Sequence, residues 1–87
     1  MYELIIKILD KSRDEGVDVL VARDMVAKDI GGHTDELMNA SAEISTHYDF
    51  ITKCRREKRT EILKEFCELL VAGSALDIKN FKEEHDV

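Results

Sequence analysis

The sequence contains no proline, and only four of its 87 residues are glycine. These two residue types interrupt helices and form tight turns more often than any others. Because both are scarce, few loops and many helices are expected. The hydrophobic share of 44% is that of a folded globular chain.

The features of secreted and membrane-spanning proteins are also missing. No stretch approaches the roughly 18–20 apolar residues that a membrane span requires. The apolar opening is broken by Lys7, and no small-residue cleavage site follows it. The two cysteines, Cys54 and Cys67, lack the spacing of metal ligands. We therefore expect a cytoplasmic protein with free thiols and no insertion into a membrane.

No catalytic or metal-binding pattern is present either. His33, His47 and His85 are scattered, with no Cys or Asp at ligand spacing beside them. A cysteine and a histidine can form a nucleophile–base pair. Cys67, however, follows Phe66 on an apolar helix face, where an inert buried thiol is expected. We expect no enzymatic activity, no metal and no cofactor.

Length and charge limit the class of protein further. The 87 residues fit one domain covering 1–87, in which 82–87 are expected to be a frayed tail. A chain this short buries only about 60–65% of its unfolded surface, so association would supplement a small core. The net charge is −6. Because phosphates repel a net-negative body, a general nucleic-acid or membrane-surface binder is not indicated.

Apolar spacing predicts an all-α fold, a compact bundle of four or five helices. Residues 2–15 carry an apolar stripe, and Gly16 follows as a helix-ending residue. A long helix is expected to contain 61–72 and to stop at Gly73. Ser74, with an acid three residues on, is placed to cap a last helix.

Two segments leave alternatives open. Residues 17–22 alternate valine with other residues and fit a short strand or an extended connection. Residues 48–72 fit one long helix, or a helix preceded by a small β-hairpin wing at 50–63. A hairpin should turn on Gly, Asn or Asp, and none lies between Arg55 and Thr60. The long helix is therefore favoured.

Residues 22–41 resemble the core of a helix-turn-helix. Inward positions of the two helices are expected at Val26, Ala27, Leu37, Ala40 and Ile44, with Tyr48 continuing the stripe. Ile30 and Gly31 also match the pattern, at the entry to the turn. The resemblance implies two short helices that cross near Ala27 and Gly31.

The presumed reading helix departs from that pattern in its charge. It carries Asp35, Glu36 and Glu43 and no Lys or Arg. Such a helix would lose the counterion-release term that dominates affinity for DNA. We expect this acidic face to meet a basic protein surface instead, such as residues 53–59 of the same chain or of a copy.

Residues 53–59 form the sharpest charge feature. Five cations against Glu57 give a net +4. The cluster could bind phosphates, an acidic protein face or anionic lipid, whereas the plain alternative is a solvated helix face. No aromatic residue interleaves with it to stack on bases. The candidate partner-binding residues are Lys53, Arg55, Arg56, Lys58 and Arg59.

The C-terminal part is rich in apolar positions. We expect homo-oligomerisation there. The candidate self-association residues are Phe66, Leu69, Leu70 and Phe81.

The opening third, "MYELIIKILDKSRDEGVDVLVARDM", resembles the lysis-inhibition accessory proteins of T-even-type bacteriophages. The resemblance implies a protein of the infected cytoplasm that binds the inner end of the holin and delays lysis. The sequence thus predicts a small non-enzymatic regulator that acts by protein–protein binding. The alternative is a helix-turn-helix transcriptional regulator whose basic cluster lies along the DNA backbone.

Overall fold

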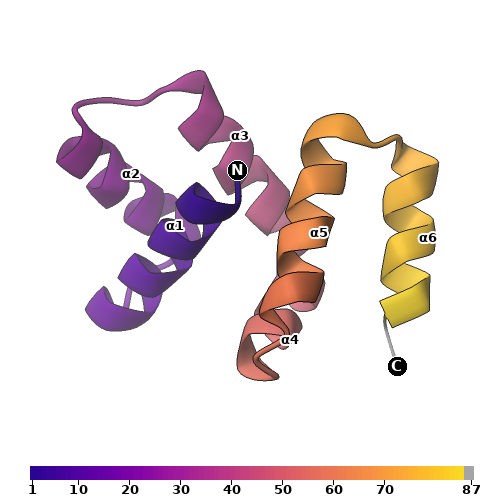
Figure 1. Ribbon diagram of the computed structural model, residues 1–87. Coiled ribbons are helices and arrows are strands. Elements are labelled where there is room, and N and C mark those ends of the chain that lie inside the picture. The colour runs from indigo at the N-terminus through magenta and orange to yellow at the C-terminus, as the bar shows by residue number, and fades with distance from the viewer. Residues whose placement is uncertain (86–87) are drawn as a thin grey trace. The chain divides into compact units, whose positions relative to one another are not determined.

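The computed structural model describes residues 1–85, and all their regular structure is helical (Figure 1). The prediction of an all-α fold is confirmed, with six helices among the described residues where four or five were expected. The helices are α1 (Tyr2–Glu15), α2 (Val19–Ile30), α3 (Asp35–Thr46), α4 (Tyr48–Arg56), α5 (Thr60–Ala72) and α6 (Ala75–His85).

Contacts between residues group the chain into two compact units, where the sequence led us to expect one domain. The first unit, Met1–Thr46, contains α1, α2 and α3. The second unit starts at His47 and contains α4, α5 and α6. Each unit has its own set of packed helices.

The first unit packs α1 against both α2 and α3. Apolar side chains at helical spacing face inward because this spacing places them on one side of each helix. Ile5 and Ile8 of α1 are fully buried. The other buried apolar residues of this unit are Leu9, Ala22, Val26, Ala27, Leu37, Ala40 and Ile44.

Residues 17–22 are not a strand. Asp18 caps α2, since its carboxylate accepts a hydrogen bond of 2.9 Å from the backbone N–H of Val21. The helix therefore begins at Val19. Ala22 is fully buried and lies one helical turn before the buried Val26. The secondary structure of this segment therefore follows the helical spacing of its buried residues and not the alternation of its valines.

The α2–α3 pair matches most of the expected inward positions. The chain turns at Gly31, whose φ of 95° lies in the left-handed region. Thr34 then caps α3, with its Oγ1 3.1 Å from the backbone nitrogen of Leu37. Ile30, at the entry to the turn, is 42% exposed. One expectation is wrong: Tyr48 is 49% exposed because it begins α4 and does not extend the stripe of α3.

The second unit is organised around aromatic rings. Phe66 of α5 is fully buried, and its ring centroid lies 4.6 Å from that of Phe50 in α4. Phe81 of α6 stacks on Phe66 with centroids 6.0 Å apart. The remaining buried residues of this unit are Ile51, Cys54, Leu63 and Cys67.

Helix α6 is the least embedded of the six. Its start has the expected capping box: Ser74 Oγ accepts from the N–H of Asp77, and Asp77 accepts from the N–H of Ser74. None of the side chains between Ala75 and His85 is buried. Residues 82–85, expected to fray, form its last turn, whereas 86 and 87 lie outside the described residues.

The chain between 48 and 72 forms two helices, so the favoured single helix and the alternative hairpin are both wrong. Lys58 ends α4 because it adopts a φ of 58°, in the left-handed region. The N–H of Arg59 donates to the carbonyl of Cys54 at 2.8 Å, and the N–H of Lys58 donates to Arg55 at 3.1 Å. This pair of bonds is the Schellman motif, which usually places glycine where Lys58 stands.

Replacing Lys58 with glycine should stabilise the protein. A left-handed conformation is costly for residues with a side chain and not for glycine. Part of that gain is offset by the greater freedom of glycine in the unfolded chain, so a net increase of about 0.5–1 kcal/mol is expected in urea unfolding. Lys64→Gly, in the interior of α5, should instead lower stability by about 1 kcal/mol. Equal losses in both variants would contradict the assigned turn.

Candidate functional site

The basic residues gather at one helix end and the turn that follows it. Lys53, Arg55 and Arg56 lie in the last turn of α4. Lys58 occupies the turn, and Arg59 precedes the first residue of α5. Cations near a helix C-terminus are favoured by the negative end of its dipole. We call residues 53–59 the basic turn.

The five cations of the basic turn are not equivalent. Arg56 and Lys58 are exposed, whereas the other three are half-buried. Arg59 is anchored twice: its Nη2 lies 3.0 Å from Glu57 Oε1, and its Nη1 donates to the carbonyl of His85 at 3.3 Å. Arg59 thus joins the turn to the end of α6. The outward part of the patch is therefore Arg56 and Lys58.

The acidic residues of α3 have a local structural role. Asp35 and Glu36 lie in its first turn, where the helix dipole favours negative charge. Glu36 Oε1 is also 3.6 Å from the N-terminal ammonium of Met1. Glu43, by contrast, is half-buried further along the helix. Only Asp35 and Glu36 therefore form an exposed acidic surface at the start of α3.

The four candidate self-association residues differ in burial. Phe66 is fully buried in the core of the second unit, so it offers no surface to a partner. Leu69, Leu70 and Phe81 are half-buried. Two of these, Leu69 and Phe81, line a groove that sequence reasoning missed.

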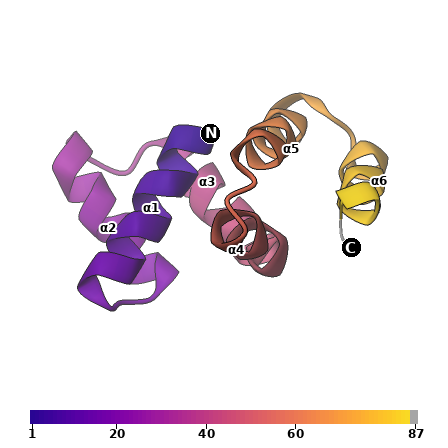
Figure 2. The same cartoon turned by 60° about the horizontal axis from the view of Figure 1, so that its bottom comes forward.

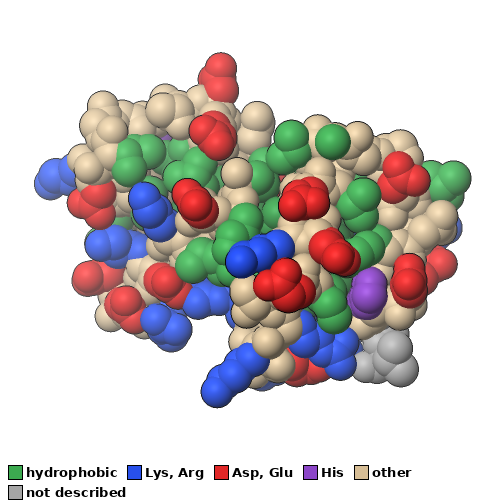
Figure 3. All heavy atoms as spheres, viewed as in Figure 1, with side chains coloured by type: hydrophobic (Ala, Val, Ile, Leu, Met, Phe, Trp, Pro, Cys, Tyr) green, Lys and Arg blue, Asp and Glu red, His purple; other side chains and the backbone are tan. Residues whose placement is uncertain are grey.

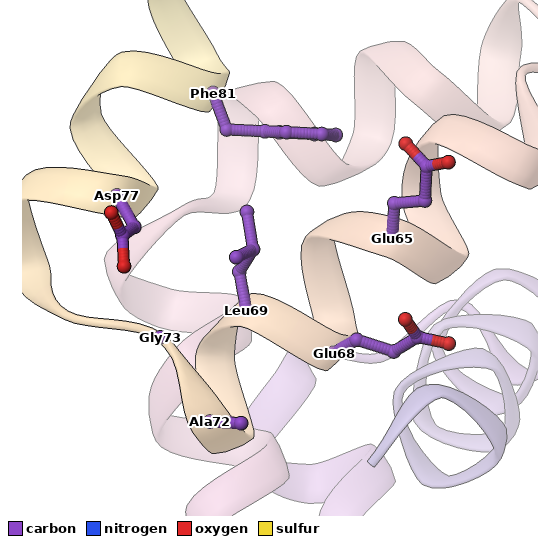
Figure 4. Close-up of a pocket in the computed structure, with 7 residues that line it drawn as sticks. All are labelled: Glu65, Glu68, Leu69, Ala72, Gly73, Asp77 and Phe81. Carbon is purple, nitrogen blue, oxygen red and sulfur yellow. The ribbon is translucent and has the colours of Figure 1, made fainter.

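This groove lies between α5 and α6 and has a volume of about 560 Å³ (Figure 4). Its apolar part is formed by Leu69, Ala72 and Phe81, with Gly73 where α5 ends. Figure 4 shows the side chain of Leu69 pointing from α5 toward that of Phe81, which extends from α6. The carboxylates that border it are Glu65, Glu68 and Asp77.

Helical spacing alone predicts which lining residues share one side of each helix. Glu65, Leu69 and Ala72 fall at i, i+4 and i+7 of α5, and so lie along one side of that helix. Asp77 and Phe81 are four apart in α6. Which sides of the two helices face each other depends on the angle of the α5–α6 connection, and that angle is not visible in the residue spacing.

In the space-filling view of the second unit, acidic side chains border apolar ones along the seen face of α5 (Figure 3). Lys and Arg side chains gather at the end of this unit that holds the α4–α5 turn. The second unit therefore presents an acidic and a basic region. Both regions are positioned by α5.

The histidine His33 contacts a carboxylate on α2. Its Nε2 lies 2.8 Å from Oδ1 of Asp24, which Arg23 Nη2 also approaches at 3.0 Å. The hydrogen bonds from His33 and then from Arg23 lower the pKa of Asp24 below its usual 3.8. This contact ties the α2–α3 turn to the outer face of α2.

The two thiols are buried, as was expected for Cys67. Cys54 is 4% exposed and Cys67 is 2% exposed. Burial raises the pKa of Cys54, and it raises the pKa of Cys67 to about 11. Within residues 1–85, no group of three or more His, Cys, Asp or Glu side chains is arranged to hold a metal ion.

Among the same described residues, no helix combines the length and the apolar character needed to cross a membrane. No family model matches the chain, and no curated protein or solved structure shows significant similarity to it.

Native Cys67 should react slowly with iodoacetamide. A rise in pKa from 9.0 to about 11 lowers the thiolate fraction near pH 8 about 100-fold, because the thiolate is the nucleophile. Alkylation followed by mass spectrometry, in buffer and in guanidinium chloride, measures the ratio of the unfolded to the native modification rate of Cys67. The exposed position of Ser45 supplies a control, since Ser45→Cys should react at nearly the unfolded rate. Fast native modification of Cys67 would contradict its burial.

Proposed function

We propose that this chain is a non-enzymatic regulatory protein that acts by binding another protein through the basic turn. The observation that carries the proposal is the Schellman motif at residues 54–59, which holds Arg56 and Lys58 exposed on a fixed backbone. A surface fixed before binding loses less conformational entropy when a partner docks. The basic turn is therefore suited to recognition.

The chemistry of the turn indicates an acidic protein surface as its partner. The turn carries a net +4 on a chain whose net charge is −6. An acidic partner is attracted to this patch and repelled by the remaining surface, so the charge distribution orients the encounter. The guanidinium of Arg56 can hold a carboxylate with two parallel hydrogen bonds.

We further propose that the partner is a phage holin, and that binding in the cytoplasm delays lysis. This step rests on the resemblance of residues 1–25 to lysis-inhibition accessory proteins. It can be tested apart from the basic turn. Co-expression with a T-even holin should lengthen the time to lysis relative to the holin alone, and unchanged timing would remove the holin proposal.

Reversing the outward charges should abolish partner binding. In the double variant Arg56→Glu/Lys58→Glu, attraction becomes repulsion, and the affinity for an acidic partner should fall at least about 100-fold. Binding to the cytoplasmic part of the holin can be followed by calorimetry. Circular dichroism should not change, because both side chains are exposed.

The matched control places the same charge change elsewhere. Lys28 and Lys79 are exposed on α2 and α6, outside the basic turn. Lys28→Glu/Lys79→Glu should reduce the affinity only a few-fold through long-range electrostatics. Equal losses in the two double variants would show that net charge, and not the turn, decides binding.

A second candidate function is supported by the buried α2–α3 pair, which has the inward residues of a helix-turn-helix. Against it stands the exposed acidic first turn of α3, which holds Asp35 and Glu36. In such motifs this part of the reading helix contacts base edges. We expect no gel shift of genomic fragments at low salt. A shifted band that weakens steeply with added salt would favour DNA binding over the protein partner.

A further inference from the structure

The groove between α5 and α6 lies in the same unit as the basic turn but has the opposite charge. Its floor is apolar, and its bordering carboxylates are Glu65, Glu68 and Asp77. No Lys or Arg is among the residues that line it. Asp77 uses one oxygen to accept the backbone N–H of Ser74. The other two carboxylates project from the exposed residues of α5.

Apolar surface is concentrated beside this groove. Of the large hydrophobic side chains in the described residues, the two most exposed are Val71 at 69% and Leu76 at 64%. Both flank the α5–α6 connection, next to the groove residues Ala72 and Asp77. Moving such side chains from water into an apolar environment is favourable. This end of the unit therefore favours contact with an apolar partner.

The packing of α6 points to the same conclusion. In the first unit, α1 contacts two neighbouring helices and buries Ile5, Ile8 and Leu9. By contrast, α6 packs on α5 and has no buried side chain between Ala75 and His85. Figure 2 shows α5 and α6 side by side as a two-helix hairpin. Phe81 also reaches α4, where its ring centroid lies 6.3 Å from that of Phe50. A further helix laid in the groove would cover side chains of α6 that are not buried by α4 or α5.

We propose that the α5–α6 groove binds an amphipathic helix of another protein, with apolar anchors facing Leu69 and Phe81 and Lys or Arg residues flanking them. Anchors at i, i+3 or i+4, and i+7 would fill the floor, as in other helix-in-groove complexes. The flanking cations would meet Glu65 and Glu68. Charge complementarity thus selects a basic helix over an acidic or neutral one.

A second copy of this chain is a poorer occupant. Each copy carries a net charge of −6 and would bring its own bordering carboxylates. Its strongly basic segment is residues 53–59, where the single apolar side chain, Cys54, is buried. That segment can supply cations but no anchor for the groove.

The test uses the full chain and a fluorescein-labelled 18-residue amphipathic helix made of Leu and Lys. Fluorescence anisotropy should show saturable binding, and a peptide of the same composition with scrambled order should bind about tenfold more weakly. Glu65→Lys/Glu68→Lys should weaken binding about tenfold more than Glu83→Lys/Glu84→Lys. Glu83 and Glu84 are exposed on α6 but do not line the groove, so the net charge change is the same.

A steric pair of variants leaves the net charge unchanged. Ala72→Trp places a large side chain in the groove and should weaken peptide binding at least about tenfold. Ser45→Trp adds the same ring at an exposed position of α3 that does not line the groove, and should retain the affinity. Circular dichroism verifies that each variant keeps its helices.

Each contrary result has a distinct meaning. Equal effects of the two charge reversals, or of the two tryptophan variants, would overturn the groove as the binding site. A wild-type dimer in ultracentrifugation that Ala72→Trp dissociates would replace the basic helix with a second copy. Arg56→Glu/Lys58→Glu should bind the basic peptide at least as tightly as the wild type, so failure of the basic-turn proposal is separable from failure here.

Discussion

The ring of Phe66 is the contact on which the second unit depends. It is fully buried in α5, and it touches Phe50 of α4 and Phe81 of α6. The His47 ring adds an edge contact at 5.2 Å, and Nδ1 of His47 lies 3.2 Å from Lys82 Nζ of α6. The Phe66–Phe50 contact holds α4 in place behind the basic turn, and the Phe66–Phe81 contact holds α6 beside α5. Without Phe66, neither the turn nor the groove would have a defined position.

The second unit places opposite charges at separate places along α5. The basic turn precedes this helix, and the acidic border of the groove runs along it. Arg59 connects the basic turn to α6, since it bonds both Glu57 and the carbonyl of His85 at the end of α6. A small chain can in this way present two surfaces of different specificity, one for an acidic partner and one for a basic helix.

Helix ends were the most predictable local features, because their chemistry is confined to a few adjacent residues. Gly16, Thr34 and the Ser74–Asp77 pair act as the sequence predicted. The break at Lys58 was not predictable in the same way. Lysine is a good helix former, so the residue type does not predict a left-handed backbone. The bonds to the carbonyls of Cys54 and Arg55 stabilise that conformation, but the residue types at 58 and 59 do not predict them.

The candidate sites were also predictable only in part. Charge could be read directly, so the basic cluster and the acidic start of α3 were found from the residues alone. Their exposure could not, because it depends on which side of each helix is covered. Phe66, expected at a self-association surface, proved to be core, whereas Ala72 and Asp77 border a groove.

By itself, the sequence determined the all-α class, several helix ends and the charge of each segment, because these follow from residue type and spacing over one or two helical turns. The tertiary structure alone decided that residues 48–72 form two helices and that Arg56 and Lys58 face outward. It also decided that α5 and α6 enclose an acid-bordered groove. The exposure and the groove arise from packing between helices, and the break arises from the left-handed backbone of Lys58. Residue type and spacing along one helix specify neither of these.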